Sequence, residues 1–372
     1  IHQTAAYVFE DAAHAADLFD LNRFGNIYTR LMNPTTAVFE ERMASLEGGV
    51  GALATASGLA AQAVAITTLL DAGGHIVASR HLYGGSHNQL AITLGRFGIA
   101  TTFVDPADTA AWHAAITPAT RLLYGETIGN PRLDVLDIAA VAAVADTHGL
   151  PLLVDNTFAT PYLCRPFEHG AHLVTHSATK WIGGHSDVLA GGVSGRADLI
   201  AEIRKVQIDT GGTIAPMSAF LVLRGIETLH VRMERHSANA LALARHLETG
   251  GLKTVSYPGL ASHPQFNVAQ RQLRAGGGMM AFELADRATA ERFLDALVLP
   301  PRTASLGSVR TICVHPPSST HRQLTSDELS AIGIPDGLVR VSVGLEEIDD
   351  LIADFDQALA AAPTRDAAGI GT

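Results

Sequence analysis

The stretch Val174-Thr-His-Ser-Ala-Thr-Lys-Trp-Ile-Gly-Gly-His-Ser-Asp187 places one lysine, Lys180, directly before Trp-Ile and a pair of glycines. The residues just before it, His172–Thr175, have the composition of a buried strand. Ser177 and Thr179 stand three residues and one residue before the lysine. A lysine alone is most often an exposed surface charge. These neighbours instead suit an amine held for covalent work, with a phosphate bound beside it.

Length and composition limit the class of protein. The chain has 372 residues, more than one ordinary domain, and 47% of them are hydrophobic, enough for a large core. A net charge of −11 disfavours nucleic acid and anionic membranes as partners, because both require a basic surface. No run has the length of a membrane span, and Ile1 does not begin a signal peptide. Since the chain opens without Met, we expect a short segment to precede it.

The cysteine and histidine residues indicate neither a disulfide framework nor a metal site. Cys164 and Cys313 lie far apart and form no metal-ligand or redox spacing, which fits a reducing cytoplasm. The 17 histidines are scattered along the chain. We therefore expect a cytoplasmic protein without a bound metal.

Residues 1–32 mix aromatic and polar side chains with little periodicity, so we expect an N-terminal arm rather than a core element. Tyr28 and Arg30 face the same side if the backbone is extended. They either lie on the chain's own surface or reach an anion on another subunit. Asn33 and Pro34 then predict the start of a helix, as N-cap and first helical residue.

From residue 50 to about 210, short apolar segments alternate with helical ones. This alternation predicts an α/β fold with a mostly parallel sheet covered by helices on both faces. The expected strands are Ile76–Ser79, Thr101–Val104, Leu122–Glu126, Leu152–Asp155, His172–Thr175 and Val188–Val193. In open sheets of this kind, ligands bind beyond the carboxyl ends of the strands. We therefore expect the functional site at that edge.

Polar residues at these strand ends suit a flat, phosphorylated cofactor. Gly58 and Leu59 open a predicted helix whose backbone N–H groups suit phosphate, although Ser57 can also be an ordinary N-cap. Tyr83 can lie over a planar ring or simply occupy a turn. Asp155 ends a buried strand, where a carboxylate is costly unless it is paired. A pyridinium nitrogen would be its partner, so the residues alone favour a pyridoxal phosphate enzyme.

The second half of the chain predicts a smaller domain. Thr213 to about Glu248 reads as one long helix that joins a large domain, residues 33–234, to a C-terminal α+β domain, residues 235–361. The tail, residues 362–372, has few large apolar residues, and we expect it to be disordered.

The strand Leu338–Val343 alternates valines with two polar residues. Arg340 and Ser342 are expected on one face and the valines on the other. A guanidinium on such a strand requires a carboxylate or phosphate. The partner is either a bound anion or, within the chain, Glu346 or Glu347.

Six motifs, taken in order, resemble those of the Cys/Met metabolism family of fold-type I pyridoxal phosphate enzymes. The resemblance implies the fold of the fold-type I PLP-dependent transferases. This family includes cystathionine γ-synthase and γ-lyase, methionine γ-lyase and the homoserine-ester sulfhydrylases. The resemblance extends from Ile1 to Ala361. The motifs are Tyr28-Thr-Arg30-x-x-Asn33-Pro34-Thr35, Ala56-Ser57-Gly58, Leu82-Tyr83-Gly84, Val154-Asp155-Asn156-Thr157, His176-Ser-Ala-Thr-Lys180 and Val339-Arg340-x-Ser342-x-Gly344-x-Glu346.

The resemblance implies a role for each residue of the site. Lys180 would form the Schiff base, and Tyr83 would stack on the ring and protonate the leaving group. The cofactor-binding residues that it implies are Lys180, Asp155, Tyr83, Ser177, Thr179, Gly58, Leu59, Tyr28 and Arg30. The substrate-binding residues that it implies are Arg340, Ser305 and Asn130. Tyr28 and Arg30 would act on the neighbouring subunit, which implies a homodimer, usually built into a tetramer.

Within the family, the motifs are mixed. The segment His185–Gly192 is similar to the methionine γ-lyase and cystathionine branch, and the chain lacks the long insertion that O-acetylhomoserine sulfhydrylases usually carry. Gly85, however, stands where typical methionine γ-lyases have cysteine, and Thr320–Leu324 resembles the sulfhydrylases. The resemblance implies a methionine γ-lyase, with O-acetylhomoserine sulfhydrylase as the alternative. More distant alternatives are a cystathionine γ-lyase or γ-synthase and a non-catalytic assembly scaffold.

Overall fold

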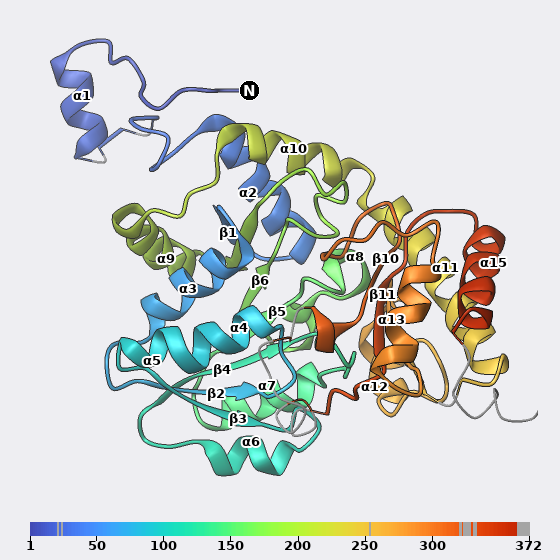
Figure 1. Ribbon diagram of the computed structural model, residues 1–372. Helices are drawn as coiled ribbons and strands as arrows, with labels where there is room; N and C mark the ends of the chain where they lie inside the picture. Colours follow the sequence, from blue (N-terminus) through green and yellow to red (C-terminus); the bar gives the residue numbers. More distant parts are fainter. Residues whose placement is uncertain are drawn as a thin grey trace, which may run out of the picture.

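The protein folds around two sheets, one large and one small (Figure 1). The structure is a computed structural model that describes residues 1–20, 22–23, 25–252, 254–319, 322, 329 and 333–362. The predicted α/β architecture, with a large sheet domain and a smaller α+β unit, is confirmed.

The large sheet has seven strands in the order β1-β7-β6-β5-β4-β2-β3. Its strands are β1 (Gly51–Thr55), β2 (His75–Ser79), β3 (Ala100–Val104), β4 (Thr120–Glu126), β5 (Leu152–Asp155), β6 (Leu173–His176) and β7 (Gly191–Gly195). Strands β2 to β6 pair in parallel, whereas β7 is antiparallel to both β6 and β1. The sheet is thus mostly parallel, as predicted.

Helices cover both faces of this sheet because its central strands are apolar on both sides. On β5, Leu152 and Val154 belong to one core and Leu153 to the other. Helix α7 packs on the first face, and α3 and α9 pack on the second. The helices up to the middle of the chain are α1 (Ala12–Phe19), α2 (Pro34–Glu47), α3 (Gly58–Leu69), α4 (Gly84–Asn88), the π-helix η1 (Gln89–Thr93), α5 (Leu94–Arg96), α6 (Thr109–Ala115), α7 (Ile138–Thr147), α8 (Thr160–Leu163), the 3-10 turn η2 (Pro166–His169), α9 (Ala197–Thr210), α10 (Pro216–Glu227) and α11 (Leu229–Thr249).

The small sheet is antiparallel, with four strands in the order β10-β11-β9-β8. Its strands and the remaining helices are β8 (Val255–Ser256), α12 (Phe266–Gln272), β9 (Met279–Glu283), α13 (Arg287–Ala296), β10 (Ile312–Val314), the 3-10 turn η3 (Pro316–Ser318), β11 (Leu338–Ser342) and α15 (Ile348–Ala360). Val339 and Val341 of β11 enter a core with α13 and α15. Arg340 and Ser342 face the other way, as the alternation predicted.

The single long helix predicted from Thr213 to Glu248 is wrong. The chain forms two helices, α10 and α11, because Thr228 leaves the helical conformation with φ −111° and ψ 8°. Helix α10 packs on α2 in the large domain. Helix α11 begins in the core of the large domain at Leu229 and ends in the core of the small domain at Leu247. The predicted boundary at residues 234 and 235 therefore lies inside α11.

Two further expectations differ from the structure. The strand predicted at Val188–Val193 is observed at Gly191–Gly195, because both backbone groups of Ala190 bond to Thr179 instead of to a neighbouring strand. Strand β1 has no counterpart in the prediction, since Gly51-Ala-Leu-Ala-Thr55 has a low β propensity and is fixed by its pairing with β7. The tertiary pairing outweighs the local preference.

The N-terminal arm contains a helix, α1, that was not predicted. Figure 1 shows the arm leading away from the large domain. Helix α2 begins as predicted, with the Asn33 side chain accepting from Thr35 N–H at 2.9 Å, and ends at Gly48, which has φ 75°. The tail predicted to be disordered lies, apart from Ala362, outside the described residues, as do Thr320, His321, Gln323 and Leu324.

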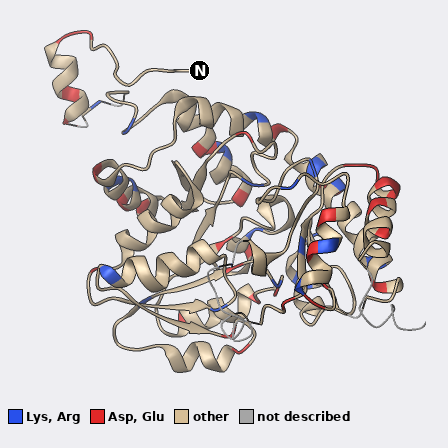
Figure 2. Cartoon of the chain, in the orientation of Figure 1, with Lys and Arg blue, Asp and Glu red and all other residues tan. Residues whose placement is uncertain are grey.

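Figure 2 shows Lys and Arg residues interspersed with Asp and Glu, and several acidic residues along α15. Among the described residues, no helix combines the length and the apolar composition that a membrane crossing requires. The same residues contain no group of three or more His, Cys, Asp or Glu side chains arranged to hold a metal ion.

Candidate active site

A cleft of about 330 Å³ opens at the carboxyl ends of β4, β5 and β6. It brings together most of the residues that the sequence singled out, from both domains. Those that line it are Gly58, Leu59, Tyr83, Asn130, Asp155, Ser177, Thr179, Lys180, Ser305 and Arg340. The expected position, beyond the strand ends of a parallel sheet, is the observed one.

Lys180 lies in the turn that follows β6, and its side chain is half-buried. Its Nζ donates to Ser305 Oγ at 3.1 Å. Burial lowers the pKa of the amine, and the neighbouring Arg340 lowers it further. A lysine whose neutral form is favoured in this way can act as a nucleophile or as a base.

Asp155 and Glu126 end neighbouring strands at the foot of the cleft. Burial raises the pKa of the Asp155 carboxyl, although Thr157 opposes this by donating its backbone N–H at 2.9 Å. Burial, together with the nearby Asp155, holds the pKa of Glu126 well above its usual range. Within the described residues no cation forms a salt bridge with Asp155. A pyridinium N–H would supply that partner, so the carboxylate fits the predicted cofactor.

The start of α3 forms a cradle of the kind that binds phosphate. Ser57 caps the helix by accepting from Ala60 N–H at 3.2 Å. The backbone N–H groups of Gly58 and Leu59 have no acceptor among the described residues, so they remain available. Gly58 lies so close to Ser177 that a β-carbon on it would be 2.7 Å from Ser177 Cβ. The helix start and the Ser177 hydroxyl group thus lie side by side.

Thr179 lines the same cleft, but its hydroxyl group is already engaged. Its Oγ1 donates to Ala190 O at 3.1 Å and accepts from Ala190 N–H at 3.0 Å. The hydroxyl proton therefore points to the backbone rather than to the cradle. A role of Thr179 in binding phosphate requires this hydroxyl to rotate, and that role stays a prediction.

Arg340 is buried, with 4% of its surface exposed. It donates to Asn130 Oδ1 at 2.9 Å and to the backbone carbonyl of Ser305 at 3.1 Å. Its Nε has no partner in the described part of the chain. Burial lowers the pKa of Arg340 to about 10, while the nearby Tyr83 acts in the opposite direction. A buried guanidinium with a free donor that lines a cleft suits a carboxylate ligand.

The internal salt bridge considered for Arg340 is ruled out. The Glu346 carboxylate accepts from Thr311 N–H at 2.7 Å and from Thr311 Oγ1 at 2.8 Å. Glu347 pairs with Arg235 at 3.1 Å. Both acids are thus bonded elsewhere, and Asn130 and Ser305, the two predicted companions of Arg340, are its actual hydrogen-bond partners.

Tyr28 and Arg30 do not line the cleft of their own chain. Tyr28 is 43% exposed, and the Arg30 guanidinium lies 5.8 Å from the centre of its ring. Arg30 also donates to the carbonyl of Ile208 in α9. Their predicted action on a neighbouring subunit stays a prediction.

A buried polar network behind the cleft was not predicted. Glu47, at the end of α2, bonds to the His176 ring, and its Oε1 also accepts from Asn156 Nδ2 at 3.0 Å. Asn156 in turn accepts from Thr127 Oγ1 at 2.7 Å. These residues join the ends of β4, β5 and β6. One signal in the sequence could have indicated the network, namely that His176 and Asn156 stand beside the motif residues Ser177 and Asp155.

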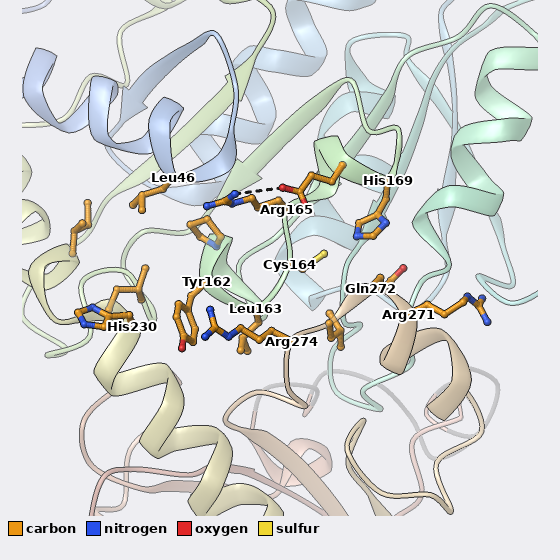
Figure 3. Close-up of a pocket in the computed structure, with 15 residues that line it drawn as sticks. Leu46, Tyr162, Leu163, Cys164, Arg165, His169, His230, Arg271, Gln272 and Arg274 are labelled. Atoms are coloured by element: carbon orange, nitrogen blue, oxygen red, sulfur yellow. Dashed lines mark hydrogen bonds and ion pairs between the residues drawn. The ribbon is translucent and has the colours of Figure 1, made fainter.

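Figure 3 shows a second, larger cavity of about 520 Å³, and Lys180 is not among the residues that line it. Its arginines are already engaged. Arg165 pairs with Glu168 at 3.4 Å, and Arg274 lies 4.6 Å from the centre of the Tyr162 ring. None of the predicted site residues line this cavity.

Comparisons with known proteins agree with this geometry. Residues 1–360 match the family described as Cys/Met metabolism PLP-dependent enzyme. The chain is 46% identical to L-methionine gamma-lyase of Pseudomonas putida, over 97% of this chain and 92% of that protein. It is 43% identical to O-acetyl-L-homoserine sulfhydrylase of Leptospira meyeri, over 96% and 91%.

A solved structure from Campylobacter jejuni, which carries N'-pyridoxyl-lysine-5'-monophosphate, superposes with a TM-score of 0.93 and is 34% identical. The match covers 97% of this chain and 94% of that one. The fold is therefore that of the fold-type I pyridoxal phosphate enzymes. The chain belongs to the Cys/Met metabolism family of pyridoxal phosphate-dependent enzymes.

Proposed function

We propose that this enzyme removes the γ-substituent of a sulfur amino acid, with methionine as its substrate and methanethiol, 2-oxobutanoate and ammonia as products. The observation that carries the proposal is that the Lys180 amine and the Arg340 guanidinium open into one small cleft and both bond to Ser305. An amine and a carboxylate-binding fork that line the same small cleft suit an α-amino acid.

Each group of the site has a place in this reaction. Pyridoxal phosphate, when bound, supplies a ring that withdraws electrons from the substrate's α carbon. Arg340 binds the carboxylate and so orients the substrate, while the Lys180 amine, whose pKa is lowered by burial, takes the α proton. Asp155 holds the ring nitrogen in its protonated form. Tyr83, at the mouth of the cleft, donates a proton to the leaving sulfur.

The extents of the two alignments support a lyase. The alignment with the Pseudomonas putida lyase spans 365 positions, close to the 372 residues of this chain. The alignment with the Leptospira meyeri sulfhydrylase takes 403 positions, more than this chain has. The sulfhydrylase thus carries inserted residues that this chain lacks, whereas the alignment with the lyase requires no such insertion.

One observation favours an O-acetylhomoserine sulfhydrylase as the second candidate. A β-carbon on Gly85 would lie 2.4 Å from Cε1 of the Tyr83 ring. The position of Tyr83 in this chain thus depends on glycine at position 85. At this position the resemblance leads us to expect cysteine in a methionine γ-lyase. With Tyr83 so placed, the same cleft would add sulfide or methanethiol in place of the lost group.

One assay separates the two candidates. The enzyme is incubated with methionine alone and 2-oxobutanoate is measured, then with O-acetylhomoserine and sulfide, and homocysteine is measured. We expect 2-oxobutanoate from methionine, and none with Lys180→Ala protein. Homocysteine formation at a much higher kcat/KM than methionine cleavage would replace the lyase by the sulfhydrylase.

We further propose a cytoplasmic homo-oligomer, a dimer or a tetramer of such dimers. The buried free thiols of Cys164 and Cys313 support a reducing compartment. The exposed Tyr28, on an arm outside its own cleft, supports a site completed by a second subunit.

A further inference from the structure

Arg232, in the first turn of α11, is a buried cation with 4% of its surface exposed. Its Nη1 donates to the carbonyl of Trp181 at 2.6 Å, and its Nη2 donates to the carbonyls of Ile182 at 3.2 Å and Gly225 at 2.6 Å. Its Nε donates to Thr228 Oγ1 at 3.1 Å. Within the described residues it has no carboxylate partner. Trp181 and Ile182 are the two residues that follow Lys180.

The carbonyls of Trp181 and Ile182 belong to a helix-like turn, and the carbonyl of Gly225 belongs to a helix end, where it also accepts from Thr228 N–H at 3.3 Å. The turn after Lys180 is closed by Gly183 N–H bonding to Ala178 O at 2.8 Å and by Gly184 N–H bonding to Lys180 O at 2.7 Å. Gly225 lies in the last turn of α10. Carbonyls at such ends carry a partial negative charge and attract cations. Arg232 therefore ties the lysine turn to the end of α10, although burial lowers its own pKa to about 10.

The glycines around this contact fit the arginine closely. Gly184 has φ 77°, and a β-carbon on it would be 2.2 Å from Arg232 Nη1. A β-carbon on Gly225 would be 2.3 Å from the carbonyl oxygen of Gly183. The close approach of the guanidinium thus requires glycine at position 184, and the close approach of the lysine turn to α10 requires glycine at position 225.

His236, one helical turn after Arg232, packs against the same segment. Its ring lies 4.6 Å from that of Trp181 and bonds to the carbonyl of Val343 at 2.7 Å. On the other side, Val309 N–H donates to Gly184 O at 3.0 Å. The backbone of the lysine turn is therefore held on several sides. Because the Lys180 amine ends a flexible four-carbon chain, its position in the cleft depends on this anchored backbone.

We propose that Arg232 is a positioning residue for Lys180, which it serves by fixing the carbonyls of Trp181 and Ile182 against the end of α10. This inference rests on the proposed function, since it takes Lys180 as the amine that binds the coenzyme aldehyde. Arg232 touches neither coenzyme nor substrate. It acts on the rate at which the amine attaches to the aldehyde, and not on how tightly the cleft binds the coenzyme, which the start of α3, Asp155 and Ser177 would hold.

The test separates covalent attachment from binding. Coenzyme-free protein is mixed with pyridoxal phosphate, and the visible absorbance follows the condensation, in which the amine nitrogen bonds to the aldehyde carbon and the oxygen leaves as water. Borohydride reduction and mass spectrometry confirm Lys180 as the site. Pyridoxamine phosphate, which has no aldehyde, gives the affinity of the cleft alone through tryptophan fluorescence.

The variants form a graded series. Thr228→Val removes one hydrogen bond from Arg232, Arg232→Lys keeps the charge without the planar fork, and Arg232→Met removes both. We expect attachment to slow by ~2-fold, ~10-fold and ~100-fold respectively, because misplacing a reacting group by about 1 Å costs a factor of this order. The affinity for pyridoxamine phosphate should change by less than ~3-fold. Arg235→Lys is the matched control, since Arg235 lies on the same helix and bonds to Glu346 O and Glu347 instead.

Four outcomes are informative. Slower attachment with unchanged pyridoxamine phosphate affinity supports the proposal. Attachment at the wild-type rate in folded Arg232 variants, with only a lower melting temperature, overturns it, because the residue then serves stability alone. If neither Arg232 variant folds, Thr228→Val decides, and a wild-type rate for it also overturns the proposal. A wild-type protein that fails to attach coenzyme at Lys180 would instead contradict the proposed function.

Discussion

Lys180 and Arg340 are joined through a single residue, because the Lys180 amine donates to the Ser305 hydroxyl at 3.1 Å and Arg340 donates to the Ser305 carbonyl at 3.1 Å. The two cations come from different domains, one from the turn after β6 and the other from β11. In the described part of the chain neither has a carboxylate partner. Arg340 therefore lowers the pKa of the Lys180 amine, in addition to the effect of burial.

The first prediction concerns substrate binding. Arg340→Gln should raise the KM for methionine ~100-fold, since the loss of a charge-assisted fork costs about 3 kcal/mol. Coenzyme affinity should change little. Steady-state kinetics and coenzyme titration measure the two effects, with Arg287→Gln as a control on a surface ion pair. Equal losses of substrate and coenzyme binding would contradict the role of Arg340.

The second prediction concerns pH. Burial and Arg340 both lower the pKa of Lys180, so the amine loses its proton at a lower pH than an exposed lysine does. Attachment of coenzyme should therefore speed up as pH rises through this lowered pKa. In Arg340→Gln protein one cause is removed, and the midpoint should move to higher pH. A stopped-flow pH profile measures it, and a midpoint that stays in place or falls would show that Arg340 does not act on the amine.

The third prediction concerns the stability of the coenzyme-free protein. Burial raises the pKa of Asp155, so the folded state holds a proton that the unfolded state has released, and the unfolding free energy falls as pH rises through the raised pKa. Asp155→Asn removes this penalty and keeps the bond from Thr157 N–H. Its melting temperature near pH 8 should exceed that of wild type by ~2 °C or more, with little difference near pH 4. Activity should be lost. A variant less stable than wild type near pH 8 would show that the ionised carboxylate is well accommodated without coenzyme.

The fourth prediction concerns Gly85. Gly85→Cys places a β-carbon against the Tyr83 ring, which must then swing away. We expect kcat for both methionine and O-acetylhomoserine to change, and by ~10-fold for the reaction in which Tyr83 acts as acid. The two kcat values, compared with those of Tyr83→Phe, measure this effect. Wild-type rates for both substrates would mean that the position of Tyr83 does not depend on residue 85.

The fifth prediction concerns sharing of sites between subunits. Arg30→Ala should loosen coenzyme, and Lys180→Ala should abolish turnover. Mixed subunits of the two variants would form hybrid dimers with one intact site, so activity should return to about a quarter of wild type. Absence of recovery after subunit exchange, verified by native mass spectrometry, would place Arg30 outside the neighbour's site.

Much of the site could be predicted because its residues stand at strand ends, where hydrophobic patterning and turn residues mark the position. Asp155 and Lys180 are of this kind. Arg340 was predicted from strand alternation alone, although its two possible partners could not be separated without the positions of Glu346 and Glu347.

Long-range contacts explain what the sequence could not predict. Arg232 lies about fifty residues from the carbonyls of Trp181 and Ile182 that it binds. Its only local signal is a charge between the buried Leu229 and Met233 on one face of α11. The break at Thr228 was missed for a related reason. In the sequence only Gly225, three residues earlier, is a helix breaker near this point. The break itself follows from the packing of α10 on one domain and of α11 on both.

Strand β11 carries a constraint on how this enzyme can change. Its alternation assigns Arg340 to the cleft and Val339 and Val341 to the core of the small domain. Inserting or deleting a single residue within this strand would exchange the two faces, burying the guanidinium in an apolar core and turning valines toward the substrate. Folding and catalysis would fail together, so new specificity on this scaffold has to arise by side-chain replacement or in loops, and not by changes of length in β11.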